Sequence, residues 1–340
     1  MKNSTSSGNL PREPVTPTGP GAAPQKRLSA ERIDALRSKH YNASAVSIQQ
    51  IHDELLIMQV RPNGFRLQFA PGQHTMLGLG YWEPRLPDTQ DEQIDEDHRQ
   101  RLAQRAYSIS CPLIDDDGQI VRATERVEQE FYTTLVRYSQ AHLPALTPRL
   151  FAMTAGDRLF ISPHGHGHYS LEKVQSDDDV IFVSTGTGEA PHNAMLAELL
   201  NHNHRGRIVN VSCVRQNCDL GYLTRHRRLE TLYANYQYLT LTTREPENLD
   251  QSVEGFIGER HTQDYFRSGD FQAESGLSLD PARTKVFLCG NPLMIGVPHH
   301  THDPAQRYPQ PTGMVEVLEQ MGFAVDRPHE PDNIYFEKYW

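Results

Sequence analysis

Cysteine and long apolar runs are scarce in this 340-residue sequence. The four cysteines, Cys111, Cys213, Cys218 and Cys289, show no CxxC pair and no spacing typical of zinc or iron–sulfur ligation. We therefore expect reduced thiols and no metal cluster. The longest apolar runs, such as VIFVS from Val180, are far too short to cross a bilayer, and the opening MKNSTSSGNLPREP has no apolar segment for export. These absences predict a cytoplasmic protein without membrane insertion.

Positive charge is also in the minority. The sequence has 33 Lys and Arg residues and 43 Asp and Glu residues, which gives a formal net charge of -10. This balance argues against a large nucleic-acid surface, and any acidic partner would need a local basic patch. The content of 37% hydrophobic and 22% charged residues is ordinary for a globular protein, and the length suggests about two domains.

The first half of the chain has the pattern of an antiparallel β-barrel. Residues 1–30 are rich in Pro, Gly, Ser and Thr, and we expect a disordered tail there. In residues 31–175, turn signals separate the short apolar segments AVSIQQI, ELLIMQV, FRLQF, QHTMLGL, AYSIS, EFYTTLV and RLFIS. Residues 84–101 are strongly acidic and interrupt this series, so they are interpreted as an exposed insertion, more a solvated loop than a site.

In the second half, residues 176–340, strand-like and helix-like segments alternate. Five strand-like segments, VIFVS, IVNVSCV, YLTLTT, KVFLC and IYFEK, alternate with helix-like segments such as AMLAELLN and GMVEVLEQM. Strands with helical crossovers predict a doubly wound, mainly parallel sheet.

Two turns of this second half could hold a phosphate. The first follows VIFVS as GTGEAP and opens a helix, where glycines allow close approach of a ligand and free N–H groups attract anions. The second is CGNP after KVFLC. The carboxyl ends of neighbouring strands face one crevice, so both turns could serve one ligand. A plain strand-to-helix turn and an inert buried thiol at Cys289 are the alternatives.

Three motifs together resemble the ferredoxin–NADP reductase family, in its bacterial and plant-type FAD-dependent forms. Residues 105–108, RAYS, are similar to the flavin-binding RxYS motif, and GTGEAP and CGNP are similar to the GTGxAP and CGxP nicotinamide motifs. Their order and spacing agree from about Ala43 to Trp340. The resemblance implies a two-domain fold, with an antiparallel β-barrel FAD domain followed by an α/β doubly wound NADP domain.

The resemblance also implies a set of FAD contacts. The closing residues YFEKYW are similar to the E-x-Y ending of plant-type members and to the Tyr-Trp ending of certain bacterial reductases. Aromatic rings suit a flat isoalloxazine, although a terminal strand packed into the core is the alternative. The implied contacts are Arg105 with the pyrophosphate, Tyr107 and Ser108 at the ring, and further Ala106, Glu130, Phe131, Tyr132, Thr147, Tyr339 and Trp340.

For NADP(H), the resemblance implies contacts from both turns. These residues are Thr187, Gly188, Glu189, Ala190 and Pro191 in the first turn and Cys289, Gly290, Asn291 and Pro292 in the second. Three arginines at strand ends, Arg215, Arg244 and Arg260, are similar in position to those that hold a 2′-phosphate, so we expect NADP rather than NAD. Scattered surface arginines are the alternative.

The family likeness places four catalytic residues around the nicotinamide, namely Ser108, Cys289, Glu337 and Tyr339. Ser108, Cys289 and Glu337 are expected to orient the ring and relay a proton, whereas Tyr339 or Trp340 is expected to occupy the place of the ring and must shift to admit it.

The implied reaction passes hydride from NADPH to FAD and single electrons to ferredoxin or flavodoxin. A flavin reductase component that serves an oxygenase or another acceptor is the alternative, and a non-catalytic nucleotide-binding scaffold is a second one.

Two histidine clusters suggest a different chemistry. HGHGH at residues 164–168 and PHHTH at 298–302 offer imidazoles that suit zinc, copper or nickel. Glycines make a loose scaffold for a tight site, so the expectation is polar loop residues and no bound metal.

Overall fold

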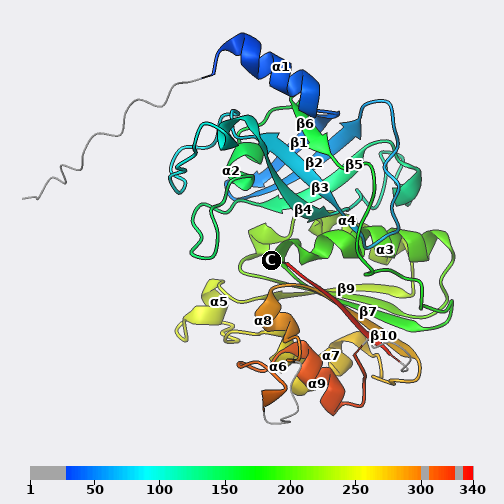
Figure 1. The fold of residues 1–340 in the computed structure, drawn as a ribbon. Coiled ribbons are helices and arrows are strands. Elements are labelled where there is room, and N and C mark those ends of the chain that lie inside the picture. Colours follow the sequence, from blue (N-terminus) through cyan, green and yellow to red (C-terminus); the bar gives the residue numbers. More distant parts are fainter. Residues whose placement is uncertain (1–27, 300–305, 326–331, 340) are drawn as a thin grey trace, which may run out of the picture.

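The computed structural model describes residues 28–299, 306–325 and 332–339, and Figure 1 shows one β-sheet in the upper half of the view and the other in the lower half, between two layers of helices. The first sheet has the strand order β4-β3-β6-β1-β2-β5, with antiparallel pairing throughout. Its strands are β1 (Ala43–His52), β2 (Leu55–Pro62), β3 (His74–Gly80), β4 (Leu102–Ser108), β5 (Gln129–Thr134) and β6 (Arg158–Ile161).

The edges of this first sheet meet, which confirms the predicted antiparallel barrel. Ser110, just after β4, donates its backbone N–H to the carbonyl of Glu130 in β5 at 2.8 Å. The predicted strand at residues 65–69 is wrong, because this segment forms only an isolated bridge between Gln68 and His164. Its backbone pairs with the histidine-rich turn instead of a second strand.

The second sheet is parallel and has the order β11-β10-β7-β8-β9. Each predicted strand of this half is confirmed, as β7 (Asp179–Thr185), β8 (Ile208–Val214), β9 (Tyr236–Thr242), β10 (Thr284–Gly290) and β11 (Ile334–Lys338). Alternate residues of these strands pack in two separate clusters, with Phe182 in one and Val183 in the other. Burial on both faces explains why the strands are continuous apolar runs.

Helices cover both faces of this sheet, as a doubly wound fold requires (Figure 1). On the barrel side lie α3 (Glu189–Asn201) and α4 (Leu223–Leu232), and on the other side α6 (Thr262–Arg267), α7 (Asp270–Ser275) and α9 (Met314–Gln320). The remaining helices are α1 (Ala30–His40), α2 (Thr147–Leu150), α5 (Pro246–Leu249) and α8 (Pro292–Ile295), with short 3-10 turns at η1 (His98–Gln100), η2 (Ala123–Glu125), η3 (Gly186–Gly188) and η4 (Asn217–Asp219). None of the helices in the described ranges is long and apolar enough to cross a membrane.

The barrel and the parallel sheet share one core, so the crevice between them is built from both. A single apolar cluster includes Ile57 and Tyr132 of the barrel together with Phe182 and Leu196 of the second half. Burial of this joint apolar surface holds the two parts together.

The acidic insertion, residues 84–101, is not wholly solvated. The carboxylate of Glu92 accepts hydrogen bonds from the guanidinium of Arg149 at 3.0 and 2.5 Å, and both side chains are buried. The backbone N–H of Leu86 donates to the carbonyl of Pro148 at 3.0 Å. The insertion therefore packs on α2, and its buried charge is paired, as burial of a carboxylate demands.

Candidate functional site

Two turns at the carboxyl ends of β7 and β10 lie against each other. A Cβ on Gly188 would lie 2.3 Å from the carbonyl oxygen of Cys289, and one on Gly290 (φ +125°) would lie 2.3 Å from Thr185 Oγ1. The backbone N–H of Asn291 donates to Thr185 Oγ1 at 2.7 Å. The expectation that both turns face one crevice is therefore met by direct contact, and only glycine permits the approach.

Replacing Gly188 with Ala should disturb this junction. The added methyl group would meet backbone atoms, which cannot rotate away, so we expect a loss of roughly 1–3 kcal/mol in unfolding free energy. Gly186→Ala is a partial control, because space around its Cβ is open but its φ of +52° carries a smaller conformational cost. Thermal unfolding of both variants measures the difference, and equal melting temperatures would contradict the close packing.

The first turn has an open face suited to an anion. No atom lies within 4 Å of the position of a Cβ on Gly186, and no side chain caps the start of α3, whose N-cap residue is Gly188. Uncapped N–H groups in the first helical turn and the positive end of the helix dipole attract phosphate. The predicted residues Thr187, Ala190 and Pro191 all belong to this η3–α3 junction.

Glu189 of this motif turns away from the open face. Its carboxylate accepts from the Tyr238 hydroxyl at 2.6 Å and lies 3.2 Å from His226 Nε2, with all three side chains buried. The side chain thus joins α3 to β9 and α4, and the backbone N–H of Glu189 donates to the carbonyls of Gly186 and Thr187.

The predicted catalytic residues come together at the edge of the crevice. The hydroxyl of Tyr339 lies 3.1 Å from Ser108 Oγ and 3.0 Å from the carbonyl oxygen of Thr187. Ser108 ends β4, so this contact joins the barrel to the first turn. Cys289 is fully buried, and burial together with the nearby Glu337 carboxylate raises its pKa well above the ordinary 9.0. A neutral thiol of this kind packs against a ring and does not act as a nucleophile.

His74 is a neighbour of this group that the sequence motifs did not indicate. Its Nδ1 lies 3.3 Å from Glu337 Oε1. Its only sequence signal is its place at the start of the segment QHTMLGL, which predicts a strand and no chemistry.

The residues predicted to hold FAD fall in two groups. Arg105 and Ala106 are exposed and Tyr107 is half-buried. The guanidinium of Arg105 donates only to the carbonyl of Gln104, at 2.8 Å, and has no carboxylate partner among residues 28–299, 306–325 and 332–339. This leaves most of its donors free for a diphosphate.

The predicted residues of β5 have partners within the protein. Phe131 is fully buried in the barrel core. Glu130 accepts from the Tyr222 hydroxyl at 2.8 Å, and the hydroxyl of Tyr132 donates to the carbonyl of Asp219 at 2.6 Å. Both polar side chains therefore connect the barrel to the second half of the protein.

Thr147, another predicted FAD contact, begins α2 but does not cap the helix. The N-cap residue is Leu146, and Thr147 Oγ1 instead accepts from the backbone N–H of Val136 at 3.2 Å. Trp340, the last predicted FAD contact, lies outside the described residues.

Of the three predicted phosphate-binding arginines, only Arg244 has no ion pair within the described residues. Its backbone N–H donates to the carbonyl of Arg215 at 2.8 Å, so these two residues are adjacent. Arg215 has carboxylates of Glu54 and Asp219 at 3.7 and 3.8 Å. Arg260 pairs with Asp270 and Glu274 at 3.3 and 3.2 Å and stacks on Tyr265.

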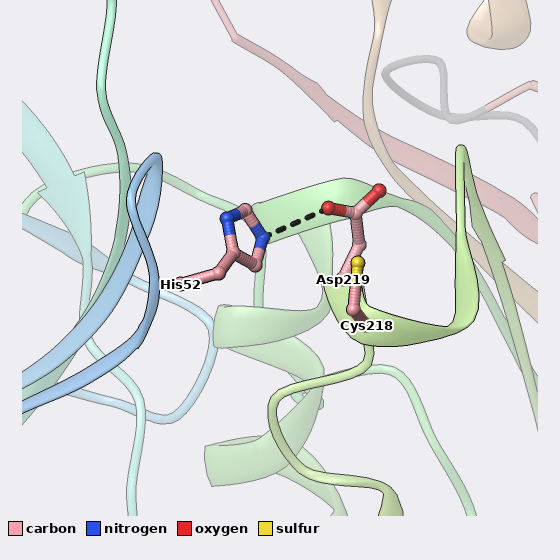
Figure 2. A group of neighbouring side chains, drawn as sticks. All are labelled: His52, Cys218 and Asp219. Carbon is pink, nitrogen blue, oxygen red and sulfur yellow. Dashed lines mark hydrogen bonds and ion pairs between the residues drawn. The ribbon is translucent and has the colours of Figure 1, made fainter.

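Figure 2 shows three possible metal ligands, namely His52, Cys218 and Asp219. His52 Nε2 lies 3.0 Å from Asp219 Oδ1, and His52 Nδ1 accepts from the backbone N–H of Glu54 at 3.2 Å. The proton of the neutral ring is therefore on Nε2, where a metal would have to bind. The arrangement fits a hydrogen bond between the barrel and η4 better than a metal centre.

Comparison with known proteins finds sequence relatives that are NADP-dependent reductases. Residues 182–299 match the family model described as the oxidoreductase NAD-binding domain. A flavodoxin/ferredoxin–NADP reductase of Escherichia coli (strain K12) is 27% identical over 230 residues, which cover 67% of this chain and 77% of the relative. A ferredoxin–NADP reductase of Pseudomonas aeruginosa is 24% identical over 267 residues, which cover 76% of this chain and 87% of the relative.

Over about two thirds of its length, the chain is similar to flavodoxin/ferredoxin–NADP reductases. Its fold is also that of a ferredoxin NADP+ reductase from Neisseria gonorrhoeae, whose crystal structure has bound FAD and NADP. The two structures superpose with a TM-score of 0.63 at 17% identity, over 87% of this chain and 97% of the other. The Tyr339 hydroxyl connects Ser108 to the turn after β7, so the residues that resemble the flavin motif and those that resemble the nicotinamide motif lie close together.

Proposed function

We propose that this protein is an FAD-dependent oxidoreductase of the cytoplasm that exchanges electrons between NADPH and a ferredoxin or flavodoxin. One observation carries the proposal: Tyr339 joins Ser108, in the flavin motif, to Thr187, in the nicotinamide motif, through its hydroxyl group. The two motifs lie about 80 residues apart in sequence, and the fold brings them to one edge.

The residues present fit both groups. The Arg105 guanidinium, which has no carboxylate partner within the described ranges, and the half-buried ring of Tyr107 suit the diphosphate and the flat ring of FAD. The open face at Gly186 and the uncapped start of α3 suit the diphosphate of NADPH. Bound FAD would supply the exchange between two-electron nicotinamide chemistry and one-electron carrier chemistry.

The protein side chains would position the reacting rings. Ser108 and Glu337 offer a hydroxyl and a carboxylate that can orient a nicotinamide amide. The neutral thiol of Cys289 offers a polarizable sulfur that can pack against the nicotinamide ring. Burial raises the pKa of Tyr339 well above 10.0, so its hydroxyl stays protonated and keeps its bonds at neutral pH. Because Tyr339 fills space between Ser108 and Thr187, we propose that it shifts when the nicotinamide enters.

Replacing Tyr339 with Ser tests this shift. Removal of the ring opens the space that the nicotinamide needs, so NADP+ should bind about tenfold more tightly to the FAD-loaded variant. Equilibrium titration followed by flavin absorbance gives both dissociation constants. Unchanged affinity would mean that Tyr339 does not compete with the nicotinamide.

Carrier-dependent electron transfer tests the proposed reaction. The FAD-loaded protein is given NADPH and cytochrome c, with and without added ferredoxin or flavodoxin. We expect the rate of cytochrome reduction to rise strongly with the carrier. Equal rates with and without each carrier, together with rapid reduction of free flavin or dye, would favour a flavin reductase component instead.

A further inference from the structure

A cross-domain ion pair lies beside the proposed catalytic residues. His74 Nδ1 is 3.3 Å from Glu337 Oε1, and the two side chains are 27% and 19% exposed. In the barrel, His74 is the register partner of Ser108, and in the parallel sheet, Glu337 is the register partner of Cys289. Each member of the pair therefore neighbours a residue that we place at the nicotinamide.

The histidine-rich turn at residues 164–168 fixes His74 from the other side. His74 and His166 exchange backbone hydrogen bonds of 3.1 and 2.7 Å. Gly167 has φ +101°, and a Cβ there would lie 3.3 Å from the His74 ring and 3.7 Å from Glu337 Oε2. Gln73 donates its side-chain amide to the Gly167 carbonyl at 2.9 Å. A glycine is thus needed for the turn to close over the ion pair.

We propose that His74 is a positioning residue for the reaction, which holds the Glu337 carboxylate in place and oriented toward the nicotinamide. The inference rests on the proposed function. Held by His74 through Oε1, the carboxylate keeps Oε2 free to accept a hydrogen bond from the amide of the bound nicotinamide. The HGHGH turn then supports this pair and needs no metal to explain its place.

The charge of His74 sets the pH range of this effect. The groups that face the pair are Glu337 itself, the His166 ring at 6.3 Å, and Cys289, Tyr169 and Tyr339, whose pKa values burial raises. The interaction with Glu337 outweighs burial and raises the pKa of His74 above the ordinary 6.5. The positive charge is therefore present at and below 6.5, and it is lost as the pH rises through this higher value.

The first test measures the ion pair without any cofactor chemistry. The imidazole proton resonances are titrated by NMR, and the signal of His74 is the one missing from His74→Gln. We expect its midpoint to fall toward 6.5 in Glu337→Gln, where the anion is gone. An unchanged midpoint would overturn the proposed pairing.

The second test measures its effect on the reaction. Rapid reduction of the bound flavin by saturating NADPH is followed between about pH 5.5 and 9. In the wild type we expect the rate to fall as the pH rises through the His74 titration. In His74→Gln we expect a rate about tenfold lower at the acid end and no such step. His168→Gln is the matched control, since His168 is exposed in the same turn, and should keep the wild-type profile.

A double variant separates positioning from general damage. If His74 acts through Glu337, then His74→Gln should have no further effect in a Glu337→Gln background. A step retained in His74→Gln, or effects of the two changes that multiply, would overturn the inference while leaving the proposed function intact. A wild-type flavin that NADPH fails to reduce at any pH would overturn both.

Discussion

Replacing Arg244 with Gln is expected to weaken NADPH binding about tenfold or more and to leave NADH binding nearly unchanged. Arg244 is exposed, adjoins Arg215 and has no ion pair among the residues that the structure describes. A free guanidinium at the end of β9 is the side chain best able to bind a 2′-phosphate, which NADPH has and NADH lacks.

The two other arginines should matter less. Arg215 already has two carboxylates within 4 Å, and Arg260 is held by two carboxylates and an aromatic ring, so each must exchange partners to bind phosphate. Dissociation constants for both nucleotides, measured by flavin absorbance, give the comparison, with Arg228→Gln on the exposed face of α4 as control. Equal loss for NADPH and NADH in Arg244→Gln would show that its role is not phosphate recognition.

A second large effect is expected for FAD retention in Arg105→Gln. The Arg105 guanidinium has no carboxylate partner in the described part of the chain, so its charge is available to the FAD diphosphate. Loss of a charge-assisted hydrogen bond of about 1.5–3 kcal/mol should weaken FAD binding by about 10- to 100-fold. Fluorescence quenching of FAD on titration with the cofactor-free protein measures this affinity.

Arg66→Gln is a close control for this change. Arg66 is also exposed on the barrel, and its guanidinium donates to a single backbone carbonyl, that of Glu125 at 3.0 Å. A similar loss of FAD affinity in both variants would point to a general effect of surface charge. The affinity of FMN, which lacks the diphosphate bridge, should change less than that of FAD in Arg105→Gln.

Periodic patterns predicted most of the fold correctly. The strands of the parallel sheet are buried on both faces, so each is a continuous apolar run that the sequence displays directly, as in VIFVS from Val180. The segment at 65–69 looks like a strand because Phe65, Leu67 and Phe69 alternate with polar residues, yet its backbone pairs with the turn at His164. Pairing partners so distant in sequence are not encoded in a local pattern.

The site could be predicted only where it rests on backbone motifs. Glycines such as Gly188 and Gly290 show in the sequence because the close approach of backbone and side-chain atoms at these positions requires glycine. The side-chain partners do not show, because they depend on which residues of the two domains meet. Glu189 is in the motif but is turned into a buried cluster, and His74 lies in an ordinary strand but reaches Glu337 across the domain junction.

The measurement that tests the central claim most directly is an anaerobic titration of the FAD-loaded protein with NADPH, followed by visible absorption. The account predicts that each protein chain binds one FAD. It also predicts that about one NADPH per flavin bleaches the flavin absorption bands, and that NADH bleaches them only at a much higher concentration. A protein that takes up no FAD, or a bound flavin that NADPH leaves oxidised, would contradict it.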